Sequence, residues 1–581
     1  MAKKIVVDPI TRIEGHLRIE AQVEDGQITD AWSVGTMWRG IEKILQGRDP
    51  RDAWYWTQRF CGVCTTVHSV ASIRAVEDAV GMTVPLNAEL IRNIIMGIQN
   101  VQDHVIHFYH LHALDWVDVV SALSADAGDA AQLAQSISDW PKSSKDYFQG
   151  VKDRVAAFVG TGRLGPFANA YWGHPAYKLP PAANLMAVAH YLEALDWQRE
   201  VIKIHAILGS KNPHPQTFLV GGMSIPVDAN SQNALNADKI AHIKQLLVQA
   251  KQFVEQVYIP DLLAVAPFYL DWAGIGGGVQ NYLSYGDFPT QESRDWNGKG
   301  LWFKPGLVRK GEFPTARVPS NDQISEYVTH SWYTYGKGDG TGLHPFDGET
   351  EPNYTGPKPP YPDQTVSDAD DKYSWVKSPR YEDTPFEVGP LARMVVGYAQ
   401  GHAEVKGAVE FALGALSKAA GTAIGAGALF STLGRTAARG LDALIQAQKN
   451  VEWVDLLAAN MGKGDLRIAD TALWERSSWP SQCQGVGFHE APRGMLSHWI
   501  NIENGEIANY QAVVPSTWNA GPRDAAGNRG PYEEALIGTP IADPEKPLEI
   551  LRTIHSFDPC LACAVHVLDG KGREITRVKV L

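Results

Sequence analysis

Cysteine is scarce in this chain, with only 5 among 581 residues. So few cysteines in so long a chain exclude a fold held together by disulfide bonds. Long apolar runs are also missing: the most apolar stretch, residues 407–434, is rich in Ala and Gly and carries Glu410 and Lys418. We therefore expect a buried helix there rather than a membrane span. The first eight residues hold two lysines and no apolar segment, so no signal peptide is predicted.

Basic residues are outnumbered, because 52 Lys and Arg against 65 Asp and Glu leave a net charge of −13. This excess of negative charge argues against nucleic acid as a partner. The chain is long enough, and at 44% hydrophobic residues apolar enough, to bury a large core.

Hydrophobic periodicity predicts an α+β fold that is mainly α. Short strands are expected near both ends, at residues 4–7, 17–23, 27–34, 499–502 and 510–514. Long helices are expected between them, at residues 86–118, 182–208, 237–263, 391–419 and 429–461. Residues 274–390 form an irregular excursion, rich in Gly and Pro, whose many aromatic residues indicate packing onto the body. Because both ends carry motifs, we expect a single intertwined domain over residues 1–581.

Four of the five cysteines form two CxxC turns, one near each end: Cys61 with Cys64, and Cys560 with Cys563. A CxxC turn points two sulfurs at one place, which suits a soft metal or a disulfide. If the fold brings the ends together, the four thiolates form one metal site. A structural zinc site is the plain alternative, but the gap between the pairs is far longer than zinc-ribbon spacing. A thioredoxin-type redox pair would need a βαβ setting that neither end shows.

Charged and proton-handling residues lie in the motifs around the cysteine pairs, and a closed structural zinc site has no use for them. Glu14, His68 and Arg493 are three of these residues. Each alone has an ordinary explanation, such as a solvated turn or a core histidine. Asp103 lies inside a strongly apolar helical pattern, where its carboxylate needs a cationic or hydrogen-bonding partner.

Six motifs, taken together, resemble the large, catalytic subunit of nickel–iron uptake hydrogenases of the membrane-bound type. They are DPITRIEGH (residues 8–16), RFCGVCTTVH (59–68), NPHPQ (212–216), HPFDG (344–348), EAPRG (490–494) and HSFDPCLACAVH (555–566). The resemblance runs from residue 6 to the C-terminus. It implies a large-subunit fold with a central bundle of long helices, and the cleavage of dihydrogen into protons and electrons at a nickel–iron centre.

The resemblance also assigns the metal ligands. Cys61 and Cys560 would be terminal ligands of nickel, while Cys64 and Cys563 would bridge to an iron that carries CO and cyanide. Thiolates donate strongly to soft late metals and tune their redox level. A magnesium ion near the C-terminus is implied as well, because oxygen ligands suit that ion. Its expected ligands are Glu42, His566 and the backbone carbonyl of Ala512.

Further residues receive roles from the same resemblance. The thiolate of Cys560 would be the first base for the proton, and Glu14 would relay that proton away. Arg493 would lie over the open metal position, oriented by Asp103 and Asp558. The residues expected on the iron side are His68, which would hydrogen-bond a bridging sulfur, Ser516, which would hydrogen-bond a cyanide, and Pro492 and Val514, which would line the same pocket.

Residues 567–581 resemble a tail that a maturation protease removes in this family, after nickel chaperones have delivered the metal. Cleavage between His566 and Val567 is therefore expected. Outside the two pairs only Cys483 remains, so the chain has no cysteines for an iron–sulfur cluster. An iron–sulfur small subunit must carry the electrons. The resemblance implies that this partner also carries the export signal, that a membrane cytochrome b accepts the electrons, and that the enzyme works at the periplasmic face of the cytoplasmic membrane.

Three other identities compete with this one: a structural zinc protein, a quinone-site subunit of a respiratory complex that shares this ancestry, and a sensory or cofactor-reducing hydrogenase. The respiratory subunit has lost the four cysteines, so their presence argues against it. The tail and the HPFDG motif favour the membrane-linked uptake class over the third alternative.

Overall fold

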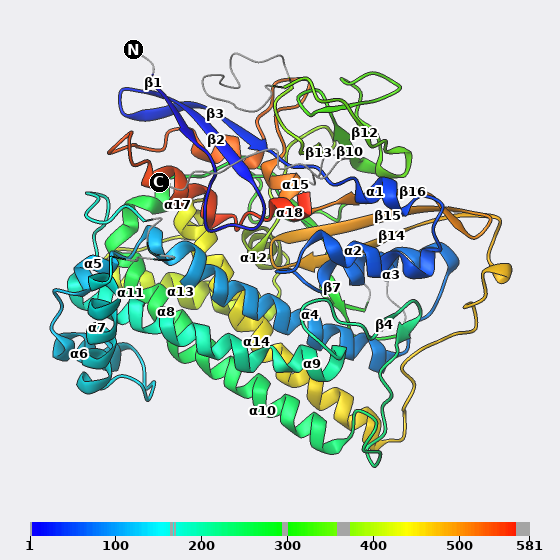
Figure 1. Ribbon diagram of the computed structural model, residues 1–581, viewed down its shortest axis with the longest axis horizontal. Coiled ribbons are helices and arrows are strands. Elements are labelled where there is room, and N and C mark those ends of the chain that lie inside the picture. Colours follow the sequence, from blue (N-terminus) through cyan, green and yellow to red (C-terminus); the bar gives the residue numbers. More distant parts are fainter. Residues whose placement is uncertain are drawn as a thin grey trace.

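The computed structural model describes residues 3–162, 165, 167, 170–292, 300–356 and 372–564, without the side chains of residues 563 and 564. Long helices fill one half of the molecule, and the sheets together with the first and last described segments fill the other half (Figure 1). The fold is α+β and mainly α, which confirms the class predicted from hydrophobic periodicity.

Four long helices form a bundle: α4 (Leu86–Ile106), α8 (Pro181–Val201), α10 (Ala237–Phe253) and α14 (Thr432–Gly462). Helices α4 and α14 pack along each other at its centre. Helix α4 is buried on nearly every side. Its polar residues, including Asp103 and His104, therefore cannot reach water and must find partners inside the protein.

Several expected helices are interrupted. The pattern over residues 86–118 is α-helical only to Ile106 and continues as a π-helical turn, His107–His112. Residues 391–419 form α12 (Pro390–Ala399) and α13 (Ala403–Ala420), separated at Gly401, which has a φ of 71°. Residues 182–208 divide into α8 and α9 (Lys203–Gly209), and residues 237–263 divide into α10 and α11 (Ile259–Val265).

Two three-stranded antiparallel sheets lie near the cysteine pairs. They are β1 (Lys3–Val7), β2 (Leu17–Glu24) and β3 (Gln27–Gly35), and β14 (Gln482–Ala491), β15 (Gly494–Glu503) and β16 (Glu506–Val513). Strand β14 is missing from the sequence prediction. Helix α3 (Val67–Val80) crosses it so closely that a Cβ on Gly487 would lie 2.0 Å from the Ala71 carbonyl oxygen. This crossing sets α3, and the cysteine pair before it, against the β14–β15 hairpin.

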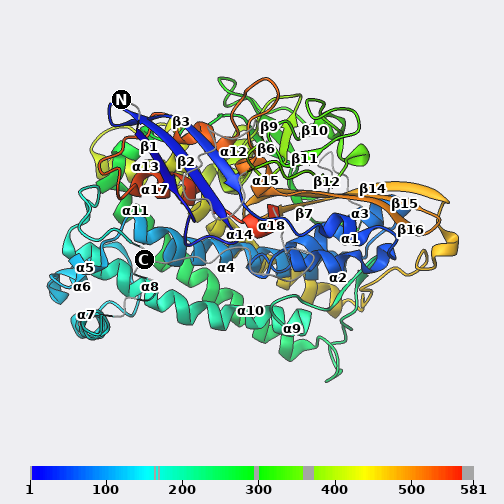
Figure 2. The same ribbon diagram turned by 45° about the horizontal axis from the view of Figure 1, so that its top comes forward.

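The N-terminal motif and the C-terminal cysteine segment meet. The Glu14 N–H donates to the Pro559 carbonyl over 3.2 Å, and the Leu561 N–H donates to the Glu14 carbonyl over 2.7 Å. Gly15 has a φ of 81°, and a Cβ there would lie 2.2 Å from the Ala562 nitrogen, so only glycine fits this crossing. Helix α18 (Leu561–Ala564) thus lies between the N-terminal sheet and α3 (Figure 2).

Within the described part of residues 274–390 the chain forms two-stranded sheets and no long helix. The pairs are β6 (Tyr282–Ser284) with β9 (Gly306–Val308), β7 (Asp287–Pro289) with β8 (Leu301–Phe303), β10 (Ile324–Tyr327) with β13 (Ser378–Tyr381), and β11 (Tyr333–Thr334) with β12 (Glu351–Pro352). Aromatic contacts join this region to the body, as where Trp375 stacks on Trp38 with 5.8 Å between ring centroids. Residue 296, another of its tryptophans, lies outside the described residues.

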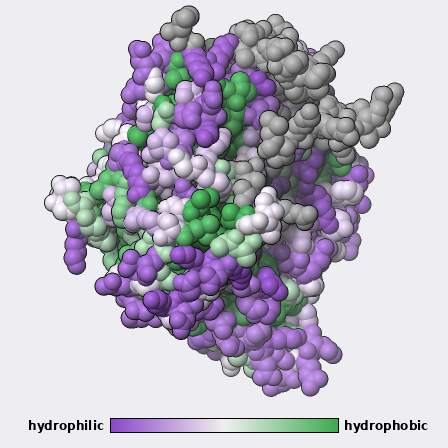
Figure 3. All heavy atoms as spheres, turned by 60° about the vertical axis from the view of Figure 1, so that its left-hand side comes forward, coloured by the Kyte–Doolittle hydropathy of each residue, from purple (hydrophilic) through white to green (hydrophobic). Residues whose placement is uncertain are grey.

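The surface is largely hydrophilic, and Figure 3 shows hydrophobic clusters surrounded by hydrophilic side chains on one face. Among the helices of the described ranges, none combines the length and the apolar character needed to cross a bilayer. The apolar stretch at residues 407–434 falls mainly on α13 and the start of α14, which pack against each other.

Glu533 on α16 (Pro531–Leu536) gives the fold a pH dependence. Its buried carboxylate accepts from the Ser33 N–H over 3.0 Å and from the Tyr373 hydroxyl over 2.8 Å. Burial nevertheless raises its pKa to about 7 from an ordinary 4.5. Between these two values the folded protein holds a proton that the unfolded chain has released, so this group's contribution to stability falls as the pH rises through that window.

The Glu533→Gln variant should lack this slope. Relative to wild type, its thermal unfolding midpoint should rise by roughly 1–2 °C between about pH 5 and about pH 7.5, as read by circular dichroism. Glu534→Gln, next to it but partly exposed, is the control and should follow wild type at both pH values. Equal pH slopes for Glu533→Gln and wild type would contradict the assignment.

Candidate metal centre

Three cysteines converge where the two ends of the chain meet. Cys61 follows a short 3-10 helix (Gln58–Phe60), Cys64 precedes α3, and Cys560 precedes α18. The Cys560 sulfur lies 3.5 Å from that of Cys61 and 3.9 Å from that of Cys64. All three are buried, and their sulfurs lie within 4.8 Å of one another, which lets one metal ion bind all of them. The side chain of Cys563 lies outside the described residues.

Arg39 fastens the two cysteine segments to each other, a role that sequence reasoning misses. Its guanidinium donates to the carbonyl oxygens of Arg59 and Phe60, over 2.9 and 2.6 Å, just before Cys61. It also donates to the Ala562 carbonyl, inside the second CxxC turn, over 2.9 Å. The only local signal is its place in the MWRGIE segment (residues 37–42), upstream of the first pair.

Arg493 lies in the turn between β14 and β15 and lines the same small cavity as Cys64 and Cys560. It donates to the Asp103 carboxylate over 3.2 Å and to the Asp558 carboxylate over 3.0 Å. Burial alone would lower the pKa of Arg493, but the charges of Asp558, Cys560 and Asp103 hold it well above its ordinary value. Burial raises the pKa of Asp103, and the nearby Arg493 opposes this by favouring the carboxylate. A permanent cation therefore stands beside the sulfurs.

A second buried arginine, Arg439 on α14, supports this layer and was not expected from sequence. Its guanidinium lies 3.5 Å from the Asp558 carboxylate and donates to the Ser556 carbonyl over 3.1 Å. Asp558 thus stands between two arginines, which holds it in place for Arg493. Nothing local in the α14 sequence marks this arginine, because Ser556 and Asp558 lie more than a hundred residues away from it in the chain.

Glu14 is held next to the metal ligands by its backbone bridge to Cys560. Its side chain is partly buried. Burial, and then the nearby Cys61, raise the pKa of Glu14, while Arg493 and Arg39 lower it, and the net direction is upward. A carboxyl whose pKa moves toward neutral pH is better suited to take up and release protons there.

His68, on the first turn of α3, lines the cavity beside the sulfurs. Its Nδ1 lies 3.0 Å from Nε2 of His498, whereas its buried Nε2 has no hydrogen-bond partner among the described atoms. Burial lowers the pKa of His68 to about 3, so the ring is neutral. Its Nε2 is thus available to a group bound in the cavity.

The cavity joins the thiolates to a set of hydrogen-bond donors. It is lined by Cys64, Val67, His68, Ala491, Pro492, Arg493, Val514, Pro515, Ser516 and Cys560. The Cys560 N–H donates to Ser516 Oγ over 3.0 Å, which holds that hydroxyl at the wall of the cavity. Soft sulfur ligands on one side and donors on the other fit a thiolate-bound nickel–iron pair with small anionic ligands. A closed zinc site would leave these donors without purpose.

Glu42, on α1 (Ile41–Leu45), lies in a second polar pocket together with Glu326, Lys377 and Ala512. Its carboxylate accepts from the Ala512 N–H over 2.9 Å and from the Thr350 hydroxyl. Glu42 and Ala512 are therefore adjacent, although the contact is made by the Ala512 N–H and not by the carbonyl oxygen expected as the magnesium ligand. The third expected ligand, His566, lies outside the described residues.

Polar side chains behind Glu42 are further residues that sequence reasoning misses. Lys377 donates to Gln511 over 2.8 Å and to the Glu349 carbonyl over 2.8 Å. Burial raises the pKa of Glu326 to about 7, which the nearby Lys377 opposes. Lys377 and Glu326 both belong to segments without a motif, so no local signal in the sequence identifies them.

A second group of metal-ligand type, His112, Asp115 and His555, is closed by the protein itself. The three lie within 4.8 Å of one another. Arg12 pairs with Asp115 at 2.6 Å, and Nε2 of His555 lies 2.8 Å from the Thr11 carbonyl. This cluster is therefore a clamp that holds the DPITRIEGH segment on α17 (Leu548–Ser556), not an open metal site.

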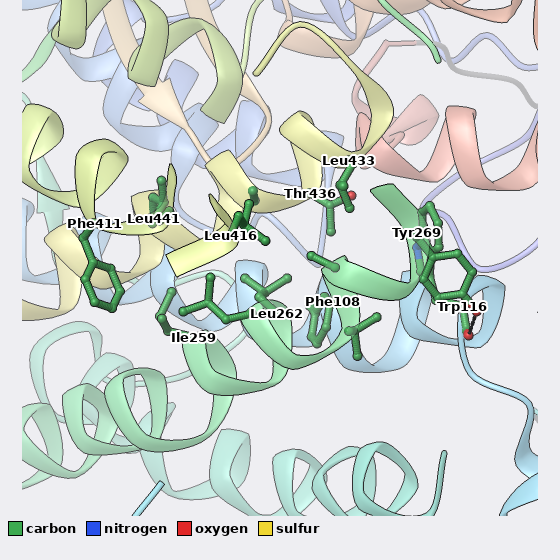
Figure 4. A pocket seen from close by; sticks show the side chains of 15 residues that line it. Phe108, Trp116, Ile259, Leu262, Tyr269, Phe411, Leu416, Leu433, Thr436 and Leu441 are labelled. Carbon is green, nitrogen blue, oxygen red and sulfur yellow. Dashed lines mark hydrogen bonds between the residues drawn. The ribbon is translucent and has the colours of Figure 1, made fainter. Parts of the chain in front are cut away.

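An apolar pocket between α11, α13 and α14 is no rival site. Figure 4 shows Ile259, Leu262, Phe411 and Leu441 around it, with Thr436 as a polar group. Among the described residues, no thiol, carboxylate or imidazole lines it, so these residues offer no set of groups for catalysis.

The fold and the buried thiolates define a redox metalloenzyme of the hydrogenase large-subunit class, and comparison with known proteins agrees. A family model described as nickel-dependent hydrogenase matches residues 39–566, and one described as HoxL-like matches residues 4–33. The uptake hydrogenase large subunit of Bradyrhizobium diazoefficiens is 52% identical over all of this chain and 97% of its own length. The hydrogenase-1 large chain of Escherichia coli is 47% identical over the same shares.

Solved structures agree with the sequence comparisons. A [NiFeSe]-hydrogenase of Dm. baculatum superposes with a TM-score of 0.74 at 34% identity, covering 97% of this chain and all of that chain. The chain belongs to the nickel-dependent hydrogenase family, as a large subunit. It is a hydrogenase, an oxidoreductase that acts on dihydrogen and works with a small subunit. This confirms the family and activity that the motifs indicate.

Proposed function

We propose that Cys61, Cys64, Cys560 and Cys563 hold a nickel–iron centre at which this chain oxidises dihydrogen. One observation carries the proposal: three of these sulfurs lie within 4.8 Å of one another in a cavity that a buried arginine also lines. A bound nickel–iron pair would supply the electrophile that takes up the electron pair of dihydrogen. Carbon monoxide and cyanide on the iron are proposed from the resemblance to the family, and the cavity is lined by Arg493 and Ser516, whose side chains can donate hydrogen bonds to a small anion.

The chain's own residues would handle the proton. As the H–H bond breaks, the thiolate of Cys560 would accept one proton and pass it to the carboxylate of Glu14. The backbone bridge between these two residues supports this order. Arg493 would polarise the bound molecule with its fixed charge, while Asp103 and Asp558 orient the guanidinium. Both electrons would leave through the small subunit, and the second proton would leave through the same two residues, Cys560 and Glu14.

Replacing Glu14 with glutamine should test the relay. The amide cannot accept a proton, so hydrogen-dependent dye reduction should fall roughly 100-fold, with nickel per protein unchanged. Glu24→Gln, exposed at the end of β2, is the control and should keep wild-type turnover. Wild-type turnover in Glu14→Gln would rule out this carboxyl as the proton exit.

A magnesium ion is proposed at the pocket of Glu42. The adjacent Glu42 and Ala512, and the polar side chains behind them, support it, because magnesium prefers oxygen ligands with several waters. His566 would complete the site from beyond the described residues. His566, the last residue of the processed chain, would then lie at the pocket of Glu42.

Processing of residues 567–581 is proposed to close the site. If it occurs, mass spectrometry of the active enzyme should find a large subunit that ends at His566. The uncut chain should accumulate, without hydrogen-dependent activity, in cells that lack the maturation protease. Recovery of full activity from an enzyme whose large subunit still ends at Leu581 would contradict this step.

The partners and location follow from the same class. An iron–sulfur small subunit would receive the electrons and pass them to a membrane cytochrome b, and nickel chaperones would load the centre. The complex would work at the periplasmic face of the cytoplasmic membrane. Cys483 is the only cysteine outside the two CxxC pairs, so this chain has too few cysteines to bind an iron–sulfur cluster. A small subunit that binds such clusters would therefore carry the electrons.

The decisive experiment is metal analysis combined with hydrogen-dependent dye reduction, on the complex expressed with its native small subunit and maturation genes. We expect about one nickel and one iron in the large subunit, one magnesium, and CO and cyanide bands in the infrared spectrum. Zinc alone, without activity after full processing, would show that the thiolates are structural.

A further inference from the structure

A line of buried polar groups continues behind His68, away from the sulfurs. Nδ1 of His68 lies 3.0 Å from Nε2 of His498 on β15, and Nδ1 of His498 lies 2.6 Å from the hydroxyl of Tyr510 on β16. The hydroxyls of Tyr510 and Ser72 are 2.9 Å apart. All four residues are at most 1% exposed, so the line ends inside the protein.

The protons along this line are coupled. A neutral imidazole donates from one nitrogen and accepts at the other. The two rings are buried, and Nδ1 of His68 and Nε2 of His498 share one hydrogen bond over 3.0 Å, so one of these two nitrogens must be the acceptor. If His68 carries its proton on Nε2, its Nδ1 must accept from His498. The remaining nitrogen of His498 must then accept from Tyr510, and the Tyr510 oxygen from Ser72. The opposite choice reverses every bond.

The cavity decides between the two directions. Nε2 of His68 is the end of the line that has no protein partner, and Cys64 and Cys560 line the cavity with it. Thiolates accept hydrogen bonds, so a bare nitrogen lone pair facing them would be repelled, whereas an N–H would be attracted. A phenol is also a better donor to an imidazole nitrogen than an acceptor from it.

We propose that His498 and Tyr510, with Ser72 behind them, are positioning residues that hold the His68 proton on Nε2, where it is donated to a thiolate of the metal centre. The inference rests on the proposed function of that centre. A hydrogen bond to a ligand sulfur withdraws electron density from the metals and tunes their potential. Strands β15 and β16 would thereby influence the nickel–iron centre, although neither strand supplies one of its four cysteine ligands.

A pair of similar-sized variants at position 498 tests this arrangement. The glutamine amide of His498→Gln can still donate a hydrogen bond to Nδ1 of His68. The leucine of His498→Leu has no donor and leaves Nδ1 without a partner. For His498→Leu we expect CO and cyanide bands at lower frequency, because the thiolate loses its donor, and turnover per nickel about tenfold lower. His498→Gln should restore the band positions. Tyr510→Phe should move the bands in the same direction as leucine but less.

Tyr285→Phe is the control, because its buried hydroxyl has no hydrogen-bond partner among the described atoms and lies outside this line. It should leave bands and turnover unchanged. Nickel-loaded His498→Leu and Tyr510→Phe enzymes with wild-type bands would overturn the inference and leave the metal centre standing. Wild-type enzyme without nickel and without these bands would instead overturn the proposed function.

Discussion

Replacing Cys560 with alanine should abolish hydrogen-dependent dye reduction and remove nickel from the protein. The Cys560 sulfur lies 3.5 Å from that of Cys61 and 3.9 Å from that of Cys64, so its loss removes a ligand next to both of these sulfurs. Losing a residue that only supports a metal ligand costs about 10- to 100-fold in activity or affinity. Losing the ligand that is also the proposed first base should cost more than about 100-fold. Nickel is measured by mass spectrometry of the purified complex.

Cys483→Ala is the matched control, since it removes a thiol of the same size from β14. Cys483 is only half buried and free, and it belongs to neither CxxC pair. Its variant should keep both nickel and turnover. A Cys560→Ala enzyme that retains one nickel and more than about a tenth of wild-type turnover would show that this sulfur is neither an essential ligand nor the base.

Helix positions followed from sequence more closely than helix ends. Apolar spacing marked the core of α4 correctly, but the same spacing continues to Leu111, beyond the point where the α-helix stops. The π-helical turn there depends on distant partners: Nε2 of His107 lies 2.6 Å from the His555 carbonyl, and Nε2 of His112 lies 3.0 Å from the Thr436 hydroxyl. These bonds join segments more than three hundred residues apart, so no local pattern contains them.

Strand β14 was not predicted from sequence, again because a tertiary contact determines its residues. Gly485 and Gly487 weaken its strand signal, because glycine lacks a side chain to pack and is common at breaks. In the fold, α3 crosses directly over these two positions and leaves no room for a side chain. A Cβ on Gly485 would lie 2.3 Å from the Ala79 nitrogen. The reason for the glycines is therefore a tertiary contact, visible only once α3 and β14 are placed together.

Some residues of the candidate site could be predicted from the sequence, and others could not. CxxC spacing alone indicated which sulfurs belong in pairs, and the meeting of Cys61, Cys64 and Cys560 required only that the ends of the chain converge. Arg39, His498 and Tyr510 could not be found from sequence. Their importance comes from groups that they contact across the fold, such as the three carbonyl oxygens that Arg39 binds, and their own neighbours in sequence carry no chemical signature.

Replacing Arg493 with lysine should lower turnover per nickel about 100-fold, without loss of the metal. Lysine keeps the positive charge that Asp103 and Asp558 require, so no buried carboxylate is left unpaired. It cannot reproduce the planar fork that reaches Asp103 at 3.2 Å and Asp558 at 3.0 Å at the same time. Its charge would therefore lie in a different place relative to the sulfurs, and losing one preorganised donor costs about 10²–10³ in rate. Alanine is a poorer test, because it strands two buried carboxylates and costs about 3–5 kcal/mol of stability.

Arg380→Lys separates the effect on catalysis from the effect on stability. Arg380 is equally buried and forks onto Asp524 at 2.8 Å and onto nearby carbonyl oxygens, but none of these groups lines the metal cavity. Both lysine variants should unfold at lower temperature than wild type, and only Arg493→Lys should lose turnover per nickel. If the two variants lose turnover equally, or if Arg493→Lys stays within about threefold of wild type, Arg493 acts as a structural ion pair and turnover does not depend on where its guanidinium fork places the charge.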